Sequence, residues 1–208
     1  EITEATPTPS WVFISTKFLA MCVVIVSIVA VAILAAIAAQ AVKGYTVFEF
    51  DQYFIRGMFE LVIPPVMLAS LAIFFQVLTN NRWLGMAVML VYFIVSLVMS
   101  QVGFDHNLYH FGSIPGAPWS DMNRYGHFFG ISVWFSVYWG FWALLLLVLA
   151  YQLWNRGAPQ PILKRLAGLF GGFSPATASL AAFAIIGAGL SGGWIFYNTN
   201  VLNEYVSG

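Results

Sequence analysis

The stretch that decides the fold is residues 13–41, FISTKFLAMCVVIVSIVAVAILAAIAAQA, in which the single charged residue is Lys17, near the start. A helix needs about 20 apolar residues to cross the roughly 30 Å hydrocarbon core of a bilayer, and this stretch is longer than that. In lipid a segment must satisfy its own backbone hydrogen bonds, and a helix does so. The sequence therefore predicts a transmembrane helix at the start of the chain.

Four more apolar runs of comparable length follow at Phe54–Leu78, Leu84–Val102, Phe128–Leu153 and Ala176–Tyr197. Of the 208 residues, 61% are hydrophobic and only 8% are charged, a balance that exceeds what a water-soluble core needs. We expect an all-α fold, a polytopic transmembrane helical bundle of about five spans. Most of the chain would then be in contact with the lipid bilayer. Because the number of spans is odd, the two termini would lie on opposite sides of the membrane.

The overall charge argues against a nucleic-acid partner. Lys and Arg together number 8, as do Asp and Glu, so the formal net charge is zero and no basic surface is available for phosphate backbones. The single cysteine, Cys22, lies inside the first apolar run. It is expected to behave as a small buried hydrophobic residue.

The distribution of Lys and Arg between the two sides predicts the orientation. The side with the N-terminus would hold Lys17, Arg82, Arg156, Lys164 and Arg165, and the opposite side Lys43, Arg56 and Arg124. Cytoplasmic loops carry an excess of Lys and Arg, so this distribution favours a cytoplasmic N-terminus. The C-terminus and the loop between the third and fourth spans would face outward.

That outer loop is the one long polar segment between apolar runs. It reads GFDHNLYHFGSIPGAPWSDMNRYGH, from Gly103 to His127, and it contains all three histidines of the chain. Its proline and glycine residues interrupt helices, and we expect chemistry outside the lipid to be concentrated here. The candidate residues are Asp105, His106, His110, Asp121, Asn123 and His127.

Two interpretations of these histidines are open. His106 and His110 are four residues apart, like two ligands on one helical face, and His127 with a carboxylate could complete a metal site. Because this spacing is common by chance, the favoured interpretation is an ordered loop whose polar side chains hydrogen-bond one another. No metal or other cofactor is expected in this chain.

Other catalytic patterns are missing from the sequence. None of the apolar runs has a histidine at depth that could hold a haem between spans. The sequence contains neither a GxxxxGK[ST] nucleotide loop nor an HExxH zinc motif. The chain by itself is therefore not expected to be an enzyme.

The second span carries a pair of charges that draws attention. Arg56 and Glu60 are one helical turn apart, and an acid close to the lipid is expensive and often functional. The simpler interpretation is that the two pair at the interface while their stems reach toward water. Pro64 and Pro65 follow directly and are expected to bend this span.

Connections and small residues predict how the spans pack. The first loop, Lys43–Tyr53, is aromatic-rich and is expected to lie along the membrane surface, whereas the Asn80-Asn81-Arg82 turn is short enough to make its two spans direct neighbours. The last span is expected to present one small-residue face for close helix packing. That face would contain Gly187, Gly189, Gly192 and Gly193.

Several stretches together resemble a known family. They are FDHNLYHFGSIPGAPWSDMNRYGHF in the outer loop, QVLTNNRWLGM around the short turn, and GGWIFYNTNVLNEY at the end of the last span. These resemble the membrane part of bacterial proteins in which an ABC exporter permease is fused to a C-terminal zinc aminopeptidase. The opening EITEATPTPSWVFISTK resembles the cytoplasmic coupling segment of such permeases. The resemblance covers nearly the whole chain.

The resemblance implies a role, partners and a location. It implies a permease-type part of an exporter in the bacterial inner membrane, with the N-terminus cytoplasmic and the C-terminus periplasmic. An ATP-binding cassette ATPase subunit would dock on a coupling segment containing Glu4, Pro7, Pro9 and Trp11, and a second permease half or a second copy would complete the pathway. The zinc-binding peptidase residues would follow Gly208, so no peptidase role falls on this chain.

The implied organisation has five parts. Residues 1–12 are the coupling-like segment, 13–155 a four-span permease core with its outer loop at 103–127, 156–175 a cytoplasmic amphipathic connector, 176–200 the fifth span, and 201–208 the start of an outer domain. Two rival functions remain. One is a non-transporting membrane anchor or scaffold subunit, and the other is an intramembrane metal enzyme that would use His106, His110 or His127.

Overall fold

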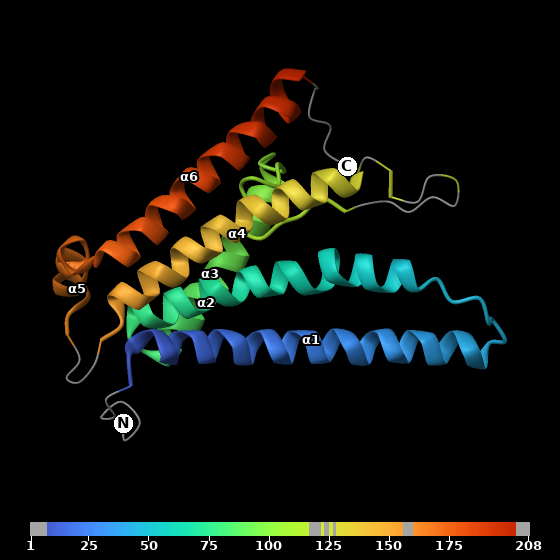
Figure 1. Ribbon diagram of the computed structural model, residues 1–208, viewed down its shortest axis with the longest axis horizontal. Helices are drawn as coiled ribbons and strands as arrows, with labels where there is room; N and C mark the ends of the chain where they lie inside the picture. Colours follow the sequence, from blue (N-terminus) through green and yellow to red (C-terminus); the bar gives the residue numbers. More distant parts are fainter. Residues whose placement is uncertain (1–7, 117–121, 123–124, 127, 156–159, 203–208) are drawn as a thin grey trace.

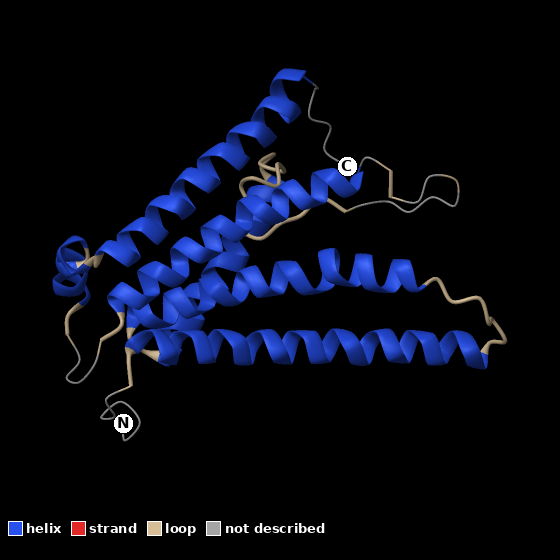
Figure 2. Ribbon diagram, viewed as in Figure 1, coloured by secondary structure: helices blue, strands red, loops and turns tan. Residues whose placement is uncertain are grey.

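The computed structural model describes residues 8–116, 122, 125–126, 128–155 and 160–202, and these form helices and loops without a strand (Figure 1, Figure 2). The elements are α1 (Ser10–Val42), η2 (Gln52–Val62), α2 (Ile63–Thr79), α3 (Arg82–Gln101), α4 (Phe128–Leu153), α5 (Ile162–Gly168), η3 (Phe170–Gly172), α6 (Pro175–Tyr197) and η4 (Asn198–Leu202). Within the described residues, 5 helical segments are long and apolar enough to cross a membrane: α1, η2 with α2, α3, α4, and α6 with η4. The predicted all-α, five-span fold is confirmed.

The first loop is shorter than predicted. Helix resumes at Phe50, because the Glu49 carbonyl accepts hydrogen bonds from the backbone N–H of Gln52 at 3.0 Å and of Tyr53 at 3.4 Å. An acidic side chain is also favourable at a helix start, where the helix dipole is positive. The predicted loop Lys43–Tyr53 is therefore wrong in its last residues, and only 43–49 connect α1 to the next helix.

The second span changes its helical geometry just before Pro64. Residues Gln52–Val62 form a π-helix, and the Ile63 backbone N–H donates to the Met58 carbonyl, five residues back. Pro64 and Pro65 lie in the first turn of α2, and because proline has no N–H, carbonyls on the preceding turn lose their donors. The second span thus changes from π-helix to α-helix at these prolines, and the bend expected there stays a prediction.

The turn between α2 and α3 is a tight hairpin, as predicted. Asn80 adopts a left-handed conformation with φ of 50°, and the Asn81 side chain caps α3 by accepting from the N–H groups of Trp83 and Leu84. Gly85 brings the two helices together, since a Cβ there would lie 3.1 Å from the Cα of Gln76.

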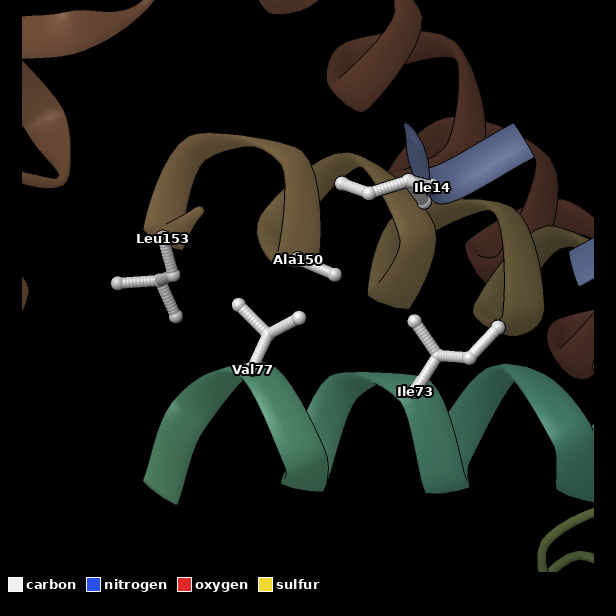
Figure 3. Close-up of a cluster of buried hydrophobic side chains, with 5 residues drawn as sticks. All are labelled: Ile14, Ile73, Val77, Ala150 and Leu153. Atoms are coloured by element: carbon white, nitrogen blue, oxygen red, sulfur yellow. The ribbon is translucent and has the colours of Figure 1, made fainter. Parts of the chain in front are cut away.

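The hydrophobic core lies at one end of the bundle. Ile73 and Val77 of α2 point toward Ala150 and Leu153 of α4, and Ile14 of α1 closes the cluster (Figure 3). Ile14 is the one described residue of α1 that is buried. Helix α1 thus joins this core near its beginning, and farther along it packs against η2, where a Cβ on Gly57 would lie 3.2 Å from Ile33 Cδ1.

The small residues of α6 pack it closely on α4, although only part of the predicted face takes part. A Cβ on Gly187 would lie 2.4 Å from the Phe141 ring, and one on Gly192 would lie 2.8 Å from the Tyr138 ring. By contrast, Gly189 has no atom within 4 Å of its Cβ position. The prediction of a single glycine face was wrong for Gly189 and its neighbour one turn on, Gly193, which also has open space.

Two ends of the bundle hold the polar groups. The connector end comprises the start of α1, the Asn80-Asn81 turn, the end of α4, and α5. The loop end comprises residues 43–49, residues 103–116, and η4. Helices α1, α2 and α4 converge at the connector end, and α1 and α6 diverge from it toward the loop end (Figure 1).

Candidate functional site

The outer loop folds back onto the helices over its described residues 103–116. Gly112, with φ of 77°, lies close to α2, because a Cβ there would be 3.2 Å from the Cβ of Met67. Trp139 Nε1 of α4 donates to the Ser113 carbonyl at 2.9 Å, and Ser132 Oγ donates to the Pro115 carbonyl at 3.0 Å. This part of the loop is a packed element of the bundle.

His110 ties the loop to α3. Its Nδ1 lies 2.7 Å from Ser96 Oγ, and its Nε2 lies 3.3 Å from Ser100 Oγ and 2.9 Å from the Phe104 carbonyl. The two serines were not predicted as site residues. Their i, i+4 spacing on one face of an apolar helix was a signal in the sequence that could have identified them.

His106 ties the loop to the end of α6. Its Nε2 lies 3.2 Å from Thr199 Oγ1, and its Nδ1 accepts the Leu108 backbone N–H at 3.1 Å. The imidazole is 9% exposed, with its ring centroid 6.3 Å from that of Phe135. Burial lowers the pKa of His106 below its usual value, because the charged imidazolium loses hydration.

The structure does not bring the two histidines together as a metal pair. Residues 107–109 form a turn instead of a helix, and the rings of His106 and His110 contact different helices. Within the described residues, no group of three His, Cys, Asp or Glu side chains is placed to hold a metal. Asp105 is exposed, while Asp121, Asn123 and His127 lie outside the described residues.

Loop stability is expected to fall as the pH falls below about 6.5, the ordinary His pKa. Because the folded-state pKa of His106 is lowered, the opened loop binds the proton more tightly, so acid favours opening. The protection of the amide hydrogens of residues 103–116 against exchange, relative to the intrinsic exchange rate at each pH, should be lower at pH 5.5 than at pH 7.5. In His106→Gln this pH dependence should shrink, and an unchanged dependence would contradict the assignment to His106.

Arg165 joins three helices at the connector end. From α5, its guanidinium donates to the Leu78 carbonyl at 3.2 Å, to the Val77 carbonyl at 2.7 Å and to the Leu153 carbonyl. These carbonyls belong to the last turns of α2 and α4, where the helix dipole favours a cation. In the sequence Arg165 only adds to the positive charge of one side, and its capping role has no local sequence signal.

Trp154 joins the start of α1 to the end of α4. Its ring stacks on Phe13 with centroids 6.3 Å apart, and Lys17 Nζ lies 4.6 Å from the ring centroid, in cation–π range. Nearby, Pro9 immediately precedes α1 and Trp11 is 60% exposed. Of the predicted coupling residues, Glu4 and Pro7 lie outside the described residues.

A pocket of about 540 Å³ opens at the connector end, which we call the connector pocket. Its walls come from α1, α2, the Asn80-Asn81 turn, the start of α3, the end of α4 and α5. Three cations line it: Lys17, Arg82 and Arg165. Among the described lining residues there is no acid.

The charged pair predicted in the second span is placed only in part. Glu60 lies in η2 and is half-buried. The Arg56 side chain lies outside what the structure describes, so the pairing of Arg56 with Glu60 stays a prediction.

Comparison of the chain with protein-family models, with curated proteins and with solved structures finds no significant match.

Proposed function

We propose that the chain is the permease-type membrane part of an ABC exporter and is linked to a periplasmic aminopeptidase. In this proposal the N-terminus is cytoplasmic and an ATPase subunit docks on the segment around Pro9 and Trp11. The observation that carries the proposal is the attachment of α1. It is held at its beginning by Ile14 in the core and by Phe13 on Trp154.

This attachment suits a coupling role for physical reasons. A displacement of the segment before α1 reaches α4 directly through the Phe13–Trp154 stack, at the point where the helices converge. Farther along its length α1 packs against the second span, since a Cβ on Gly57 of η2 would lie 3.2 Å from Ile33 Cδ1 and 3.9 Å from Val29 Cγ1. A displacement at its start would therefore move α1 together with the second span as one rigid body, as alternating access requires.

The charge distribution supports the cytoplasmic orientation. Of the cations whose backbone the structure describes, Lys17, Arg82, Lys164 and Arg165 lie at the connector end, and Lys43 and Arg56 lie toward the loop end. This agrees with the excess of Lys and Arg on the cytoplasmic side of membrane proteins. The peptidase and a second permease half or second copy remain parts of the proposal that the resemblance supplies.

A second candidate is a non-transporting anchor for an outer domain. It is favoured by the contact of His106 with Thr199, which joins the outer loop to the end of α6 and so forms one composite surface at the loop end. This candidate predicts no ATPase partner, and it leaves Trp11 without a role.

The test compares Trp11→Ala with Trp83→Ala in the native complex, isolated through a tag on this chain. Both tryptophans are exposed at the connector end, at 60% and 66%. Truncating a tryptophan at the centre of an interface costs about 2 kcal/mol or more. Co-purifying ATP hydrolysis should therefore fall strongly in Trp11→Ala and stay unchanged in Trp83→Ala.

Two outcomes would count against the proposal. Absence of ATP hydrolysis from the complex would favour the anchor. Equal ATP hydrolysis in the two variants would show that Trp11 is not part of the docking site. The mass of the native polypeptide tests the linkage to a peptidase, because a fused enzyme requires a species far heavier than the 23.0 kDa of this chain.

A further inference from the structure

The connector pocket combines charges that nothing described around it neutralises. Lys17 comes from α1, Arg82 from α3 and Arg165 from α5, so three separate elements bring their cations to one cavity. No acid is among its described lining residues. Cations gathered in a cavity with apolar walls repel one another and attract an anion.

The pocket walls also contain hydrogen-bond donors that lack an acceptor. The Nε1 of Trp154 and the Nε of Arg165 are buried and have no hydrogen-bond partner among the described residues, and both residues line the pocket. Buried N–H groups are nearly always paired in folded proteins. Phosphate oxygens are strong acceptors for such donors and for guanidinium groups.

The pocket changes from polar to apolar along the direction of the helices. Its polar part is formed by the three cations together with the amides of Asn80 and Asn81 at the end of the bundle. Deeper along α1 and α2, the walls are Ala20, Met21 and Ala72. A molecule that fits both parts has an anionic head and an apolar body.

We propose that the connector pocket binds an anionic phospholipid, with its phosphate among Lys17, Arg82 and Arg165 and its acyl chains along the apolar walls of α1 and α2. Basic pockets between transmembrane helices bind such headgroups. The volume of about 540 Å³ is within the usual range for ligand sites. A soluble phosphate would fill only the polar part.

This occupant would also hold α1 against α2 and α3. The headgroup would bridge Lys17 of α1 to Arg82 of α3, two cations that cannot pair with each other. Retention of the lipid should therefore stabilise the attachment of α1 at its beginning. The inference depends on the pocket alone and holds for either proposed function.

The experiment measures lipid retention on the intact chain by native mass spectrometry from mixed micelles. Phosphatidylglycerol is compared with phosphatidylcholine of the same acyl chains, for the native chain, Lys17→Gln, Arg82→Gln and the double variant. Each basic group near an anionic headgroup contributes about five-fold in affinity. The double variant should therefore retain phosphatidylglycerol about 25-fold less tightly.

Matched controls come from cations outside the pocket. Lys164→Gln removes a neighbour of Arg165 on α5 that does not line the pocket, and Lys43→Gln removes a cation at the loop end. Both should leave retention unchanged. Arg165 is kept intact because its loss would also remove the caps of α2 and α4, and melting in lipid-free detergent verifies that each variant folds.

The outcomes separate the lipid from other occupants. Preferential retention of phosphatidylglycerol that depends on Lys17 and Arg82 supports the proposal. Equal retention of both lipids, or equal losses in Lys164→Gln, overturns it. Inorganic phosphate that raises the melting temperature with the same dependence, while phosphatidylglycerol is not retained, also overturns it in favour of a soluble anion.

Discussion

Substituting Gly187→Ala is expected to lower the free energy of unfolding by about 1–3 kcal/mol, the usual cost of overpacking a close contact. The added Cβ would lie 2.4–2.6 Å from three atoms of the Phe141 ring, far inside normal contact distance. The ring cannot retreat freely, because it also packs edge-on against Phe183 with centroids 5.4 Å apart. Thermal unfolding in detergent would measure the loss.

Two variants show whether the loss comes from this contact. Gly189→Ala places the same methyl group two residues away, where no atom lies within 4 Å, and should be neutral or slightly stabilising. Combining Gly187→Ala with Phe141→Ala should cost less than the sum of the single changes, since removing the ring relieves the clash. Strictly additive costs would contradict the proposed contact.

Substituting Arg165→Gln is expected to cost about 2 kcal/mol, because hydrogen bonds from a charged donor contribute about 1.5–3 kcal/mol and this side chain is half-buried. Three carbonyls in the last turns of α2 and α4 would lose their shared donor. The loss should separate α5 from the bundle and expose the Leu78 backbone to exchange. Hydrogen exchange at the end of α2, together with unfolding, would measure both effects.

The planar fork of the guanidinium is what this position requires. Arg165→Lys keeps the charge but cannot reach several carbonyls at once, so it should recover only part of the lost stability. Lys164→Gln removes the same charge from an exposed neighbour and should change stability by less than about 0.5 kcal/mol. Equal effects at residues 164 and 165 would show that net charge, and not capping, is responsible.

The spans were predictable because the bilayer imposes a length and a composition that single sequences display directly. The predicted Leu84–Val102 and the observed Arg82–Gln101 differ by only a few residues. The hairpin at Asn80 followed from its shortness alone. The prolines led us to expect a bend, and the π-helix of residues 52–62 that precedes them had no signal that distinguishes it from an α-helix.

The site could not be predicted to the same extent, because its contacts join residues far apart in the chain. His106 meets Thr199, 93 positions away, and Arg165 meets Val77, 88 positions away. The periodic pattern of apolar residues in a sequence does not indicate such distant pairs. The His106 and His110 spacing instead suggested a shared helical face, and a turn at residues 107–109 separates the two rings.

The length of α1 has a consequence for the surrounding membrane. From Phe18 onward this helix is about 37 Å long, at 1.5 Å per residue, whereas the hydrocarbon core is about 30 Å thick. With Lys17 held at the interface, this hydrophobic mismatch is accommodated by tilting α1, by thickening the bilayer around it, or by both. Because α1 also packs against η2 through Val29 and Ile33, a change in bilayer thickness would tilt the first two spans together.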